Sequence, residues 1–310
     1  MQTLSRFLAG LLFAAGVLFA QFDYDAKQPF DATCEPLSKR SDAELLGCGF
    51  SGVRGGRVHF ILVKPTVAKP PFAGVIFQHG GGQSMTNYLS EALILARAGV
   101  ISIIPDAPAR GEGKNTELHT MKLEAARDFQ AEVVITERRV LDWLLQQPGI
   151  DAKRMAYVGH SYGGVAGAVL TGVEPRIAAF VLSGAVTSEV RFIQDNQSPE
   201  WQQMRHNLSP EEFTKTMDLL RETDPDRYLP KARAPVLVQC ARFDTDENVR
   251  GCPAVYEITG GPKQITWYDD DHHFTSLEAL RDRLAWLEKH LKLTPLGPEI
   301  AKFLDRNSGK

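Results

Sequence analysis

The chain has 310 residues, which suffices for one large α/β domain or two small ones. Hydrophobic residues make up 43% of it, charged residues 24%, and the formal net charge is -3, values that describe an ordinary globular protein. Because there is neither a basic excess nor a long run of like charge, the composition excludes a typical nucleic-acid-binding protein, and we expect no nucleic-acid partner.

The first 20 residues differ from the rest of the chain. Arg6 supplies a positive charge, and residues 7–20 are uncharged and apolar. This run is too short to span a bilayer comfortably, so it predicts a signal peptide over residues 1–20. We therefore expect a secreted or periplasmic protein with no stable membrane insertion after the peptide is removed. Leu18 is larger than the residue preferred before a cleavage site at Ala20, so an uncleaved N-terminal membrane anchor is the alternative.

Export affects how the four cysteines are interpreted. Cys34, Cys48, Cys240 and Cys252 form an even set, as expected of disulfides in an oxidising compartment. We favour Cys34–Cys48 and Cys240–Cys252, because each pair closes a short local loop; four free buried thiols are the alternative. No cysteine has the spacing of a metal ligand set, and we predict no metal.

Strands and helices are predicted from the apolar pattern in chain order. Residues 21–56 are polar, glycine-rich and weakly periodic, and predict an N-terminal arm laid over the domain. Short apolar runs predict strands at 58–63, 73–78, 100–104, 155–158, 178–182, 236–240 and 264–268. Amphipathic spacing predicts helices at 88–98, within 123–147 and at about 276–291, followed by a tail over 293–310.

The alternation of these elements predicts the fold class. Strands that are apolar throughout and alternate with amphipathic helices indicate a mostly parallel, doubly wound sheet with helices on both faces, over residues 57–292. Residues 187–232 interrupt the alternation with irregular helical segments. We expect them to form a small helical cap over the carboxyl edge of the sheet, where open α/β sheets place their sites.

The segment Gly159-His160-Ser161-Tyr162-Gly163 reads G-x-S-x-G. It follows a predicted strand and precedes a helical run of small residues at 165–170. A serine hydroxyl becomes an effective nucleophile when a sharp strand-to-helix turn presents it to a base, and the glycines remove side chains that would clash in that turn. The pattern predicts Ser161 as a nucleophile; a glycine-rich turn with a capping serine is the alternative.

A serine nucleophile needs a base, and the base needs an orienting carboxylate. In this architecture both follow later strands, in the order serine, acid, histidine. The strand predicted at 236–240 is followed by Asp244 and Asp246, and the strand predicted at 264–268 by His272 and His273. Each strand end therefore offers two candidates.

At these points the sequence resembles the α/β-hydrolase superfamily, in its dienelactone-hydrolase-like serine esterase branch, over residues 55–292. Four features in chain order carry the resemblance: a strand followed by His79-Gly80-Gly81-Gly82, the G-x-S-x-G segment, a strand followed by an aspartate, and D-x-D-H before the last helix. Dienelactone hydrolases use a cysteine nucleophile. Ser161 departs from that pattern and implies ordinary ester chemistry.

The resemblance also favours one candidate in each pair. Asp244 stands at the family's offset from the strand, although Asn248 and Val249 resemble the residues after the acid in some relatives and would favour Asp246. His272 fits the D-x-D-H frame, and His273 would be a neighbour packing on the cap.

The implied chemistry is acyl transfer. His272 takes the proton from Ser161 as it attacks a carbonyl, and Asp244 fixes the tautomer of the imidazole. The developing oxyanion needs two donors, which we assign to the backbone N–H of Tyr162 and that of Gly81 or Gly82. We expect no cofactor.

The sequence predicts a secreted serine hydrolase that cleaves a small-molecule ester with a small-to-medium acyl group or an acetylated substrate. A serine peptidase of the prolyl-oligopeptidase-like type and a non-catalytic binding module on the same fold are the alternatives. The apolar side chains of the cap either line an acyl or alcohol pocket or form the cap's own core: Phe192, Trp201, Met204 and Phe213.

Overall fold

The computed structural model describes residues 20–106 and 123–307, so most of the predicted signal peptide lies outside the described residues. Nine strands form one sheet: β1 (Thr33–Lys39), β2 (Ala43–Ser51), β3 (Arg57–Pro65), β4 (Phe72–Gln78), β5 (Val100–Pro105), β6 (Ile150–His160), β7 (Ala179–Ser183), β8 (Val236–Ala241) and β9 (Lys263–Tyr268). Their order across the sheet is β1-β2-β3-β5-β4-β6-β7-β8-β9.

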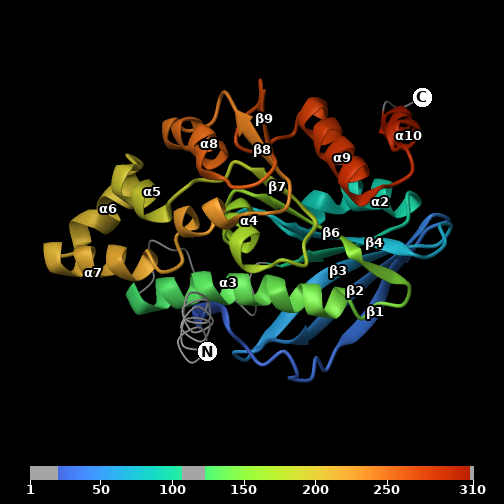
Figure 1. Ribbon diagram of the computed structural model, residues 1–310, viewed down its shortest axis with the longest axis horizontal. Coiled ribbons are helices and arrows are strands. Elements are labelled where there is room, and N and C mark those ends of the chain that lie inside the picture. The colour runs from blue at the N-terminus through green and yellow to red at the C-terminus, as the bar shows by residue number, and fades with distance from the viewer. Residues whose placement is uncertain (1–19, 107–122, 308–310) are drawn as a thin grey trace, which may run out of the picture.

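Helices lie on both faces of this sheet. The α-helices are α2 (Leu89–Arg97), α3 (Leu123–Leu144), α4 (Tyr162–Val173), α5 (Glu189–Asp195), α6 (Pro199–Asn207), α7 (Pro210–Leu220), α8 (Asp246–Ile258), α9 (Leu277–Leu291) and α10 (Gly297–Asn307). Short 3-10 helices are η1 (Ala20–Phe22), η2 (Met85–Tyr88), η5 (Pro225–Arg227) and η6 (Leu229–Lys231). Figure 1 shows α3 on one side of the central strands β4 and β6, and α2, α9 and α10 on the other. Across the two described ranges, no helix is both long and apolar enough for a membrane span.

The six strands from β5 to β9 in sheet order run parallel to one another, as predicted. Every residue of β5, β7 and β8 is buried, because helices cover both faces. Side chains of α3, α4 and α8 pack on one face, and those of α2 and α9 on the other. The predicted fold class, an α/β fold with a mostly parallel sheet between helices, is confirmed.

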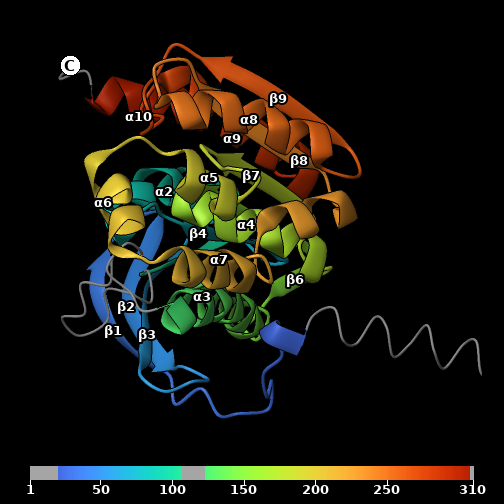
Figure 2. The same ribbon diagram turned by 90° about the vertical axis from the view of Figure 1, so that its left-hand side faces the viewer.

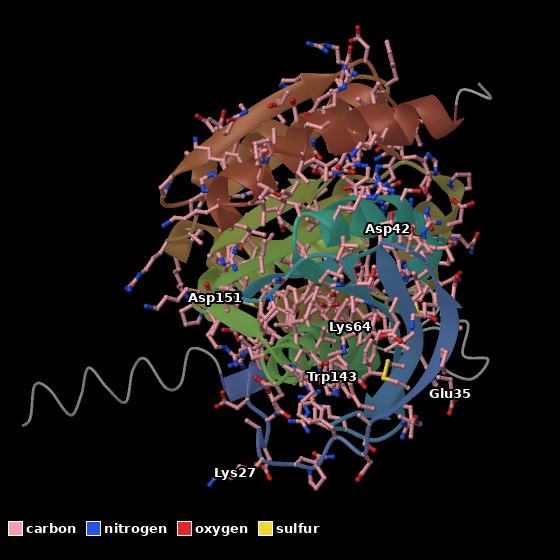
Figure 3. The ribbon with its side chains drawn as sticks, turned by 90° about the vertical axis from the view of Figure 1, so that its right-hand side faces the viewer. Lys27, Glu35, Asp42, Lys64, Trp143 and Asp151 are labelled. Carbon is pink, nitrogen blue, oxygen red and sulfur yellow. A yellow bond between two sulfur atoms is a disulfide. The ribbon has the colours of Figure 1, made fainter. Side chains whose placement is uncertain are left out.

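The first two strands correct the prediction of an N-terminal arm over residues 21–56. β2 pairs with β3 along its whole length, and β1 pairs with β2, so this segment extends the sheet with antiparallel strands. Two features hid these strands in the sequence. Every residue of β1 is exposed, and Gly47 and Gly49 interrupt the apolar alternation of β2. The Cys34–Cys48 disulfide joins β1 to β2 and appears as a yellow bond on the blue N-terminal strands in Figure 3.

The predicted C-terminal tail also has structure, because residues 297–307 form α10. This helix is held to α2 by an ion pair in which Arg97 Nη1 lies 2.8 Å from Glu299 Oε2. Arg97 also contacts Asp42, just before β2, at 2.6 Å. Arg97 of α2 therefore links α10 to the residue that precedes β2.

Between β7 and β8, helices α5 to α7 form a group that Figure 2 shows in front of α4. The group has its own small core: Val190, Ile193, Met217 and Leu220. It is tied to the chain before β8 by Asp224, whose carboxylate accepts hydrogen bonds from Ser188 Oγ at 2.5 Å and from the backbone N–H of Glu189 at 2.7 Å. This is the segment predicted to form a helical cap.

Candidate active site

Ser161 stands between the end of β6 and the start of α4, in a sharp turn. Its φ of 51° and ψ of -113° are a strained combination for a residue with a side chain. The backbone N–H of Ser161 donates to the carbonyl oxygen of Ser183, at the end of the neighbouring strand, at 2.8 Å. The strand-to-helix turn predicted from the G-x-S-x-G segment is therefore present.

The glycines of the turn are required by close backbone approach. A Cβ atom at Gly159 would overlap the carbonyl oxygen of Gly163, and a Cβ atom at Gly163 would overlap the carbonyl oxygen of Gln78 at the end of β4. Helix α4 consequently begins with its backbone directly against β4. This packing fixes the direction in which the Ser161 side chain leaves the turn.

The structure brings Ser161, His272 and Asp244 together, although they are far apart in sequence. His272 Nε2 lies 2.8 Å from Ser161 Oγ, and His272 Nδ1 lies 2.7 Å from Asp244 Oδ2. The Asp244 side chain is only 2% exposed, whereas that of His272 is 33% exposed. A buried acid thus holds an imidazole that faces both the serine and solvent.

The environment of Asp244 favours its charged form. Burial acts to raise the pKa of this carboxyl, but hydrogen bonds from His272 and Asn248 outweigh burial and lower the pKa below its ordinary value. Asn248 Nδ2 donates to Asp244 Oδ1 at 2.9 Å, and the backbone N–H of Thr245 donates to the same oxygen at 2.7 Å. Asp244 is therefore an ionised acceptor for the imidazole.

The two alternative residues are placed differently. His273 Nδ1 lies 3.2 Å from Asp271 Oδ1, and the side chain of His273 is 63% exposed, so it faces solvent rather than Ser161. Asp246 is the first residue of α8, and its side chain lies outside what the structure describes.

The segments predicted to supply the oxyanion donors adjoin the nucleophile. Tyr162 is the first residue of α4, and the first N–H groups of a helix have no acceptor within it. A Cβ atom at Gly80 would lie 2.8 Å from His160 Nδ1 and 3.0 Å from Ser161 Cβ, so the loop that continues into Gly81 and Gly82 lies against the turn. Gly82 has a φ of 74°, which favours glycine.

The loop that carries these glycines is anchored by His79. This fully buried imidazole places Nδ1 2.8 Å from the carbonyl oxygen of Gly80 and Nε2 3.2 Å from Asp106 Oδ1, at the end of β5. The anchor ties the loop after β4 to the neighbouring strand β5.

Both predicted disulfides are present, and one of them flanks the acid. Cys240, in β8, is bonded to Cys252, in α8, with a Cα–Cα distance of 5.8 Å. The segment between the two half-cystines contains both Asp244 and Asn248. The bond therefore closes the loop that presents the carboxylate.

The four apolar residues of the cap are half-buried. Trp201, Met204 and Phe213 pack against the small core of this segment. Phe192 meets Trp201 edge to face, with ring centroids 5.8 Å apart. This placement favours the prediction of a cap core over that of a substrate pocket.

Three polar residues of the site were missed by sequence reasoning: Gln83, His160 and Asn248. Each also contacts a residue that is distant in sequence, and no local pattern marks such a contact. The sequence marks Asn248 only as a neighbour of Asp246. Within the described ranges, no group of three or more His, Cys, Asp or Glu side chains is arranged to hold a metal ion.

The chain is similar in sequence to two esterases and in fold to a solved acetyl xylan esterase. An acetyl esterase, Axe7A, from Xylanibacter ruminicola is 23% identical over 88% of this chain, which spans 66% of that protein's length. Esterase YjfP from Escherichia coli is 27% identical over 71% of this chain and 90% of its own. The solved acetyl xylan esterase from Paenibacillus sp. R4 superposes with a TM-score of 0.75 at 18% identity, covering 88% of this chain and 92% of its own.

The two protein relatives are both esterases, in agreement with the predicted carboxylic ester hydrolase. The family model described as "Alpha/beta hydrolase family" matches residues 75–296, well over half of the 310 residues. That range includes the strand-to-helix turn at Ser161 and the loops that carry Asp244 and His272. The chain belongs to the alpha/beta hydrolase family.

Proposed function

We propose that this protein is a secreted serine hydrolase that cleaves carboxylic esters of small acyl groups, acetyl esters in particular. The proposal rests on two hydrogen-bond distances. Asp244 Oδ2 lies 2.7 Å from His272 Nδ1, and His272 Nε2 lies 2.8 Å from Ser161 Oγ. Hydrogen bonds of this length join a nucleophile to its base and the base to its orienting acid.

The reaction proceeds by acyl transfer. His272 Nε2 takes the Oγ proton as Ser161 attacks the ester carbonyl, and the ionised Asp244 stabilises the imidazolium that forms. The tetrahedral oxyanion is held by the N–H of Tyr162 and by one from Gly81 or Gly82. The alcohol leaves with the proton from His272, and water, activated by the same imidazole, then releases the acid from the acyl-serine.

The acetyl preference rests on the names of the similar proteins. One relative is named an acetyl esterase, and the structure with a TM-score of 0.75 is an acetyl xylan esterase. The exported setting rests on the sequence of residues 1–20 and on the two disulfides, which persist in oxidising compartments.

Labelling with a fluorophosphonate tests the mechanism. We expect the wild-type protein to gain one label, located at Ser161 by peptide mass, and we expect Ser161→Ala and His272→Ala to lose it. A folded wild-type protein that stays unlabelled would instead be the non-catalytic binding module.

A substrate panel tests the reaction class. It contains p-nitrophenyl esters from acetate to palmitate, acetylated xylan, and an aminoacyl p-nitroanilide as the peptidase substrate. The proposal predicts the highest kcat/KM for acetate, acetate release from xylan and no anilide cleavage. Preferred cleavage of the anilide would identify a peptidase.

Fractionation tests export. The full chain, expressed in a bacterium, is expected in the periplasm or the medium with a new N-terminus near residue 21, and an intact chain held in the membrane would indicate an anchor.

A further inference from the structure

His160, the residue before the nucleophile, contacts two segments of the site at once. Its imidazole is 5% exposed and lies between the loop after β4 and the loop after β9. Nδ1 lies 2.9 Å from Gln83 Oε1, and Nε2 lies 2.5 Å from the carbonyl oxygen of His272. One ring therefore joins the loop of the oxyanion donors to the residue that carries the base.

Gln83 extends this connection to the backbone of the glycine loop. Its Oε1 accepts a hydrogen bond of 2.8 Å from the N–H of Gly80, and the N–H of Gln83 donates to the carbonyl oxygen of Gly80 at 3.3 Å. The loop backbone also rests on the His160 ring, since a Cβ atom at Gly80 would lie 2.8 Å from Nδ1. The glycine loop is thus held to His160 by the amide and by direct packing.

The buried ring of His160 lies among aromatic side chains. The ring packs against two aromatic rings, with centroids 5.0 Å away for His272 and 5.9 Å for Phe274. Burying the ring nitrogens of a histidine costs free energy unless they are hydrogen-bonded, and an apolar side chain would fill the same space without that cost. The histidine at this position is therefore explained by its polar contacts.

The protonation state of His160 decides which of its ring nitrogens donates a hydrogen bond. Burial, and after it the neighbouring His272, lowers the pKa of His160 to about 4, so the ring is neutral at neutral pH and has one N–H. Donation from Nε2 to the His272 carbonyl leaves Nδ1 as an acceptor. The Gln83 oxygen that accepts from the Gly80 N–H is also the atom that lies against Nδ1, so Gln83 meets the ring by close packing, and Nε2 makes the ring's hydrogen bond.

We propose that Gln83 and His160 are positioning residues that together hold the oxyanion loop and the base loop at a fixed separation across Ser161. The proposal rests on the proposed serine mechanism for its effect on rate. In the transition state, the oxyanion donors and the imidazole must fit one tetrahedral centre, and a misplacement of about 1 Å can cost about 100-fold in rate. Neither side chain touches the reacting atoms in this scheme.

Two variants remove the bridge while keeping side-chain size. Gln83→Met has the length of glutamine without its hydrogen bonds, and His160→Phe retains the ring. We expect each to lower kcat per fluorophosphonate-titrated site about 10- to 100-fold with KM changed less than about threefold. His160→Gln, which can still donate to the His272 carbonyl, is expected to recover part of kcat. Gln264→Met, at an exposed position of β9, is the matched control and should behave as wild type.

A double-mutant cycle separates one bridge from two independent packing sites. If the residues act through one another, the fold-loss in Gln83→Met/His160→Phe will be close to the larger single loss rather than to the product of both. Independent losses that multiply, or single variants with kcat per titrated site within twofold of wild type, would overturn the proposal.

Hydrogen exchange followed by mass spectrometry supplies a readout that does not need catalysis. In Gln83→Met we expect several-fold faster exchange in residues 269–274, to which the described contacts of the Gln83 side chain lead through His160. Unchanged exchange there contradicts the bridge. A wild-type protein with neither hydrolysis nor labelling would overturn the proposed function instead. Faster or unchanged exchange in Gln83→Met would even then support or contradict the bridge.

Discussion

The side-chain amide of Asn248 donates a 2.9 Å hydrogen bond to Asp244 Oδ1, while the other oxygen of the same carboxylate faces His272. Asn248 Nδ2 also lies 3.1 Å from His272 Nδ1. The carboxylate is therefore oriented by a residue of α8 that also lies beside the imidazole. This contact fixes which oxygen is presented to the imidazole.

Removing that contact should slow catalysis without affecting binding. In Asn248→Leu, Asp244 loses a hydrogen bond to a charged group, worth about 1.5–3 kcal/mol, and we expect kcat to fall at least about tenfold with little change in KM. Asn207→Leu, at the exposed end of α6, is the matched control. Steady-state kinetics on p-nitrophenyl acetate provide the measurement, and wild-type kcat in Asn248→Leu would contradict the orienting role.

The two aspartates of the acid loop can be separated by matched amides. Asp244→Asn should lower kcat by about four orders of magnitude, because the amide stabilises the wrong tautomer of the imidazole, as in the serine protease triad. Asp246→Asn should stay within about threefold of wild type. If the larger loss appears in Asp246→Asn, the assignment of the acid is wrong.

The turn at Ser161 should not tolerate a methyl group on its helix side. In Gly163→Ala the new Cβ would overlap the carbonyl oxygen of Gln78, so α4 has to move away from β4. We expect a loss of about 1–3 kcal/mol in the free energy of unfolding and loss of fluorophosphonate labelling. Gly251→Ala is the control, because the nearest described atom would be 3.5 Å from its Cβ. Urea denaturation measures the free energy of unfolding, and the rate of fluorophosphonate labelling measures the nucleophile. Wild-type values of both in Gly163→Ala would refute this account of the turn.

The two disulfides should differ in their effect on activity but not on stability. They close loops of similar length, with sequence separations of 14 and 12, so removing either should cost about 3 kcal/mol in the chain-entropy model. Only Cys240→Ala/Cys252→Ala should also lower kcat, since Asp244 and Asn248 lie within its loop. Cys34→Ala/Cys48→Ala, in antiparallel strands away from the acid, serves as the control. Equal kcat in both double variants would show that the loop is rigid without its disulfide.

Glu137 should make stability fall as pH rises. Within the described part of the chain, neither oxygen of this buried α3 side chain has a hydrogen-bond partner, and burial raises its pKa from 4.5 to about 8. Between these two values the folded protein binds more protons than the unfolded chain. The free energy of unfolding therefore decreases with increasing pH, by up to about 1.4 kcal/mol per pH unit.

Substitution of Glu137 tests this dependence. Glu137→Leu should be more stable than wild type at pH 8, and its unfolding free energy should change less between pH 5 and pH 8. A slope of the same sign will remain, because burial, together with Asp224, raises the pKa of Glu189 to about 8 as well. Exposed Glu211→Leu should leave the slope unchanged, and an unaltered slope in Glu137→Leu would disprove the assignment.

Most of the parallel sheet could be predicted because its signals are local. Strands covered on both faces are continuous apolar runs, and a loop that carries a site residue follows each of β4, β6, β8 and β9. Ser161, Asp244 and His272 follow β6, β8 and β9, whose carboxyl ends lie at one edge of the sheet. Motif and chain order were sufficient to place these three residues near one another.

The remaining features depend on long-range pairing that no local window records. β2 is stabilised by its register with β3 and by burial of Leu45 and Phe50, not by its own alternation. The partners of His160 are 77 residues before it and 112 residues after it. Residues of this kind are recognised only when the three-dimensional contacts are known.

The separate apolar core of α5 to α7 makes this segment an exchangeable module. Its packed side chains face one another rather than the interior on either side of the sheet, so its shape can change while the nucleophile, base and acid stay where strand ends put them. We therefore expect substitutions inside this separate core to change the local stability of α5 to α7 while the distances among Ser161, His272 and Asp244 stay as they are.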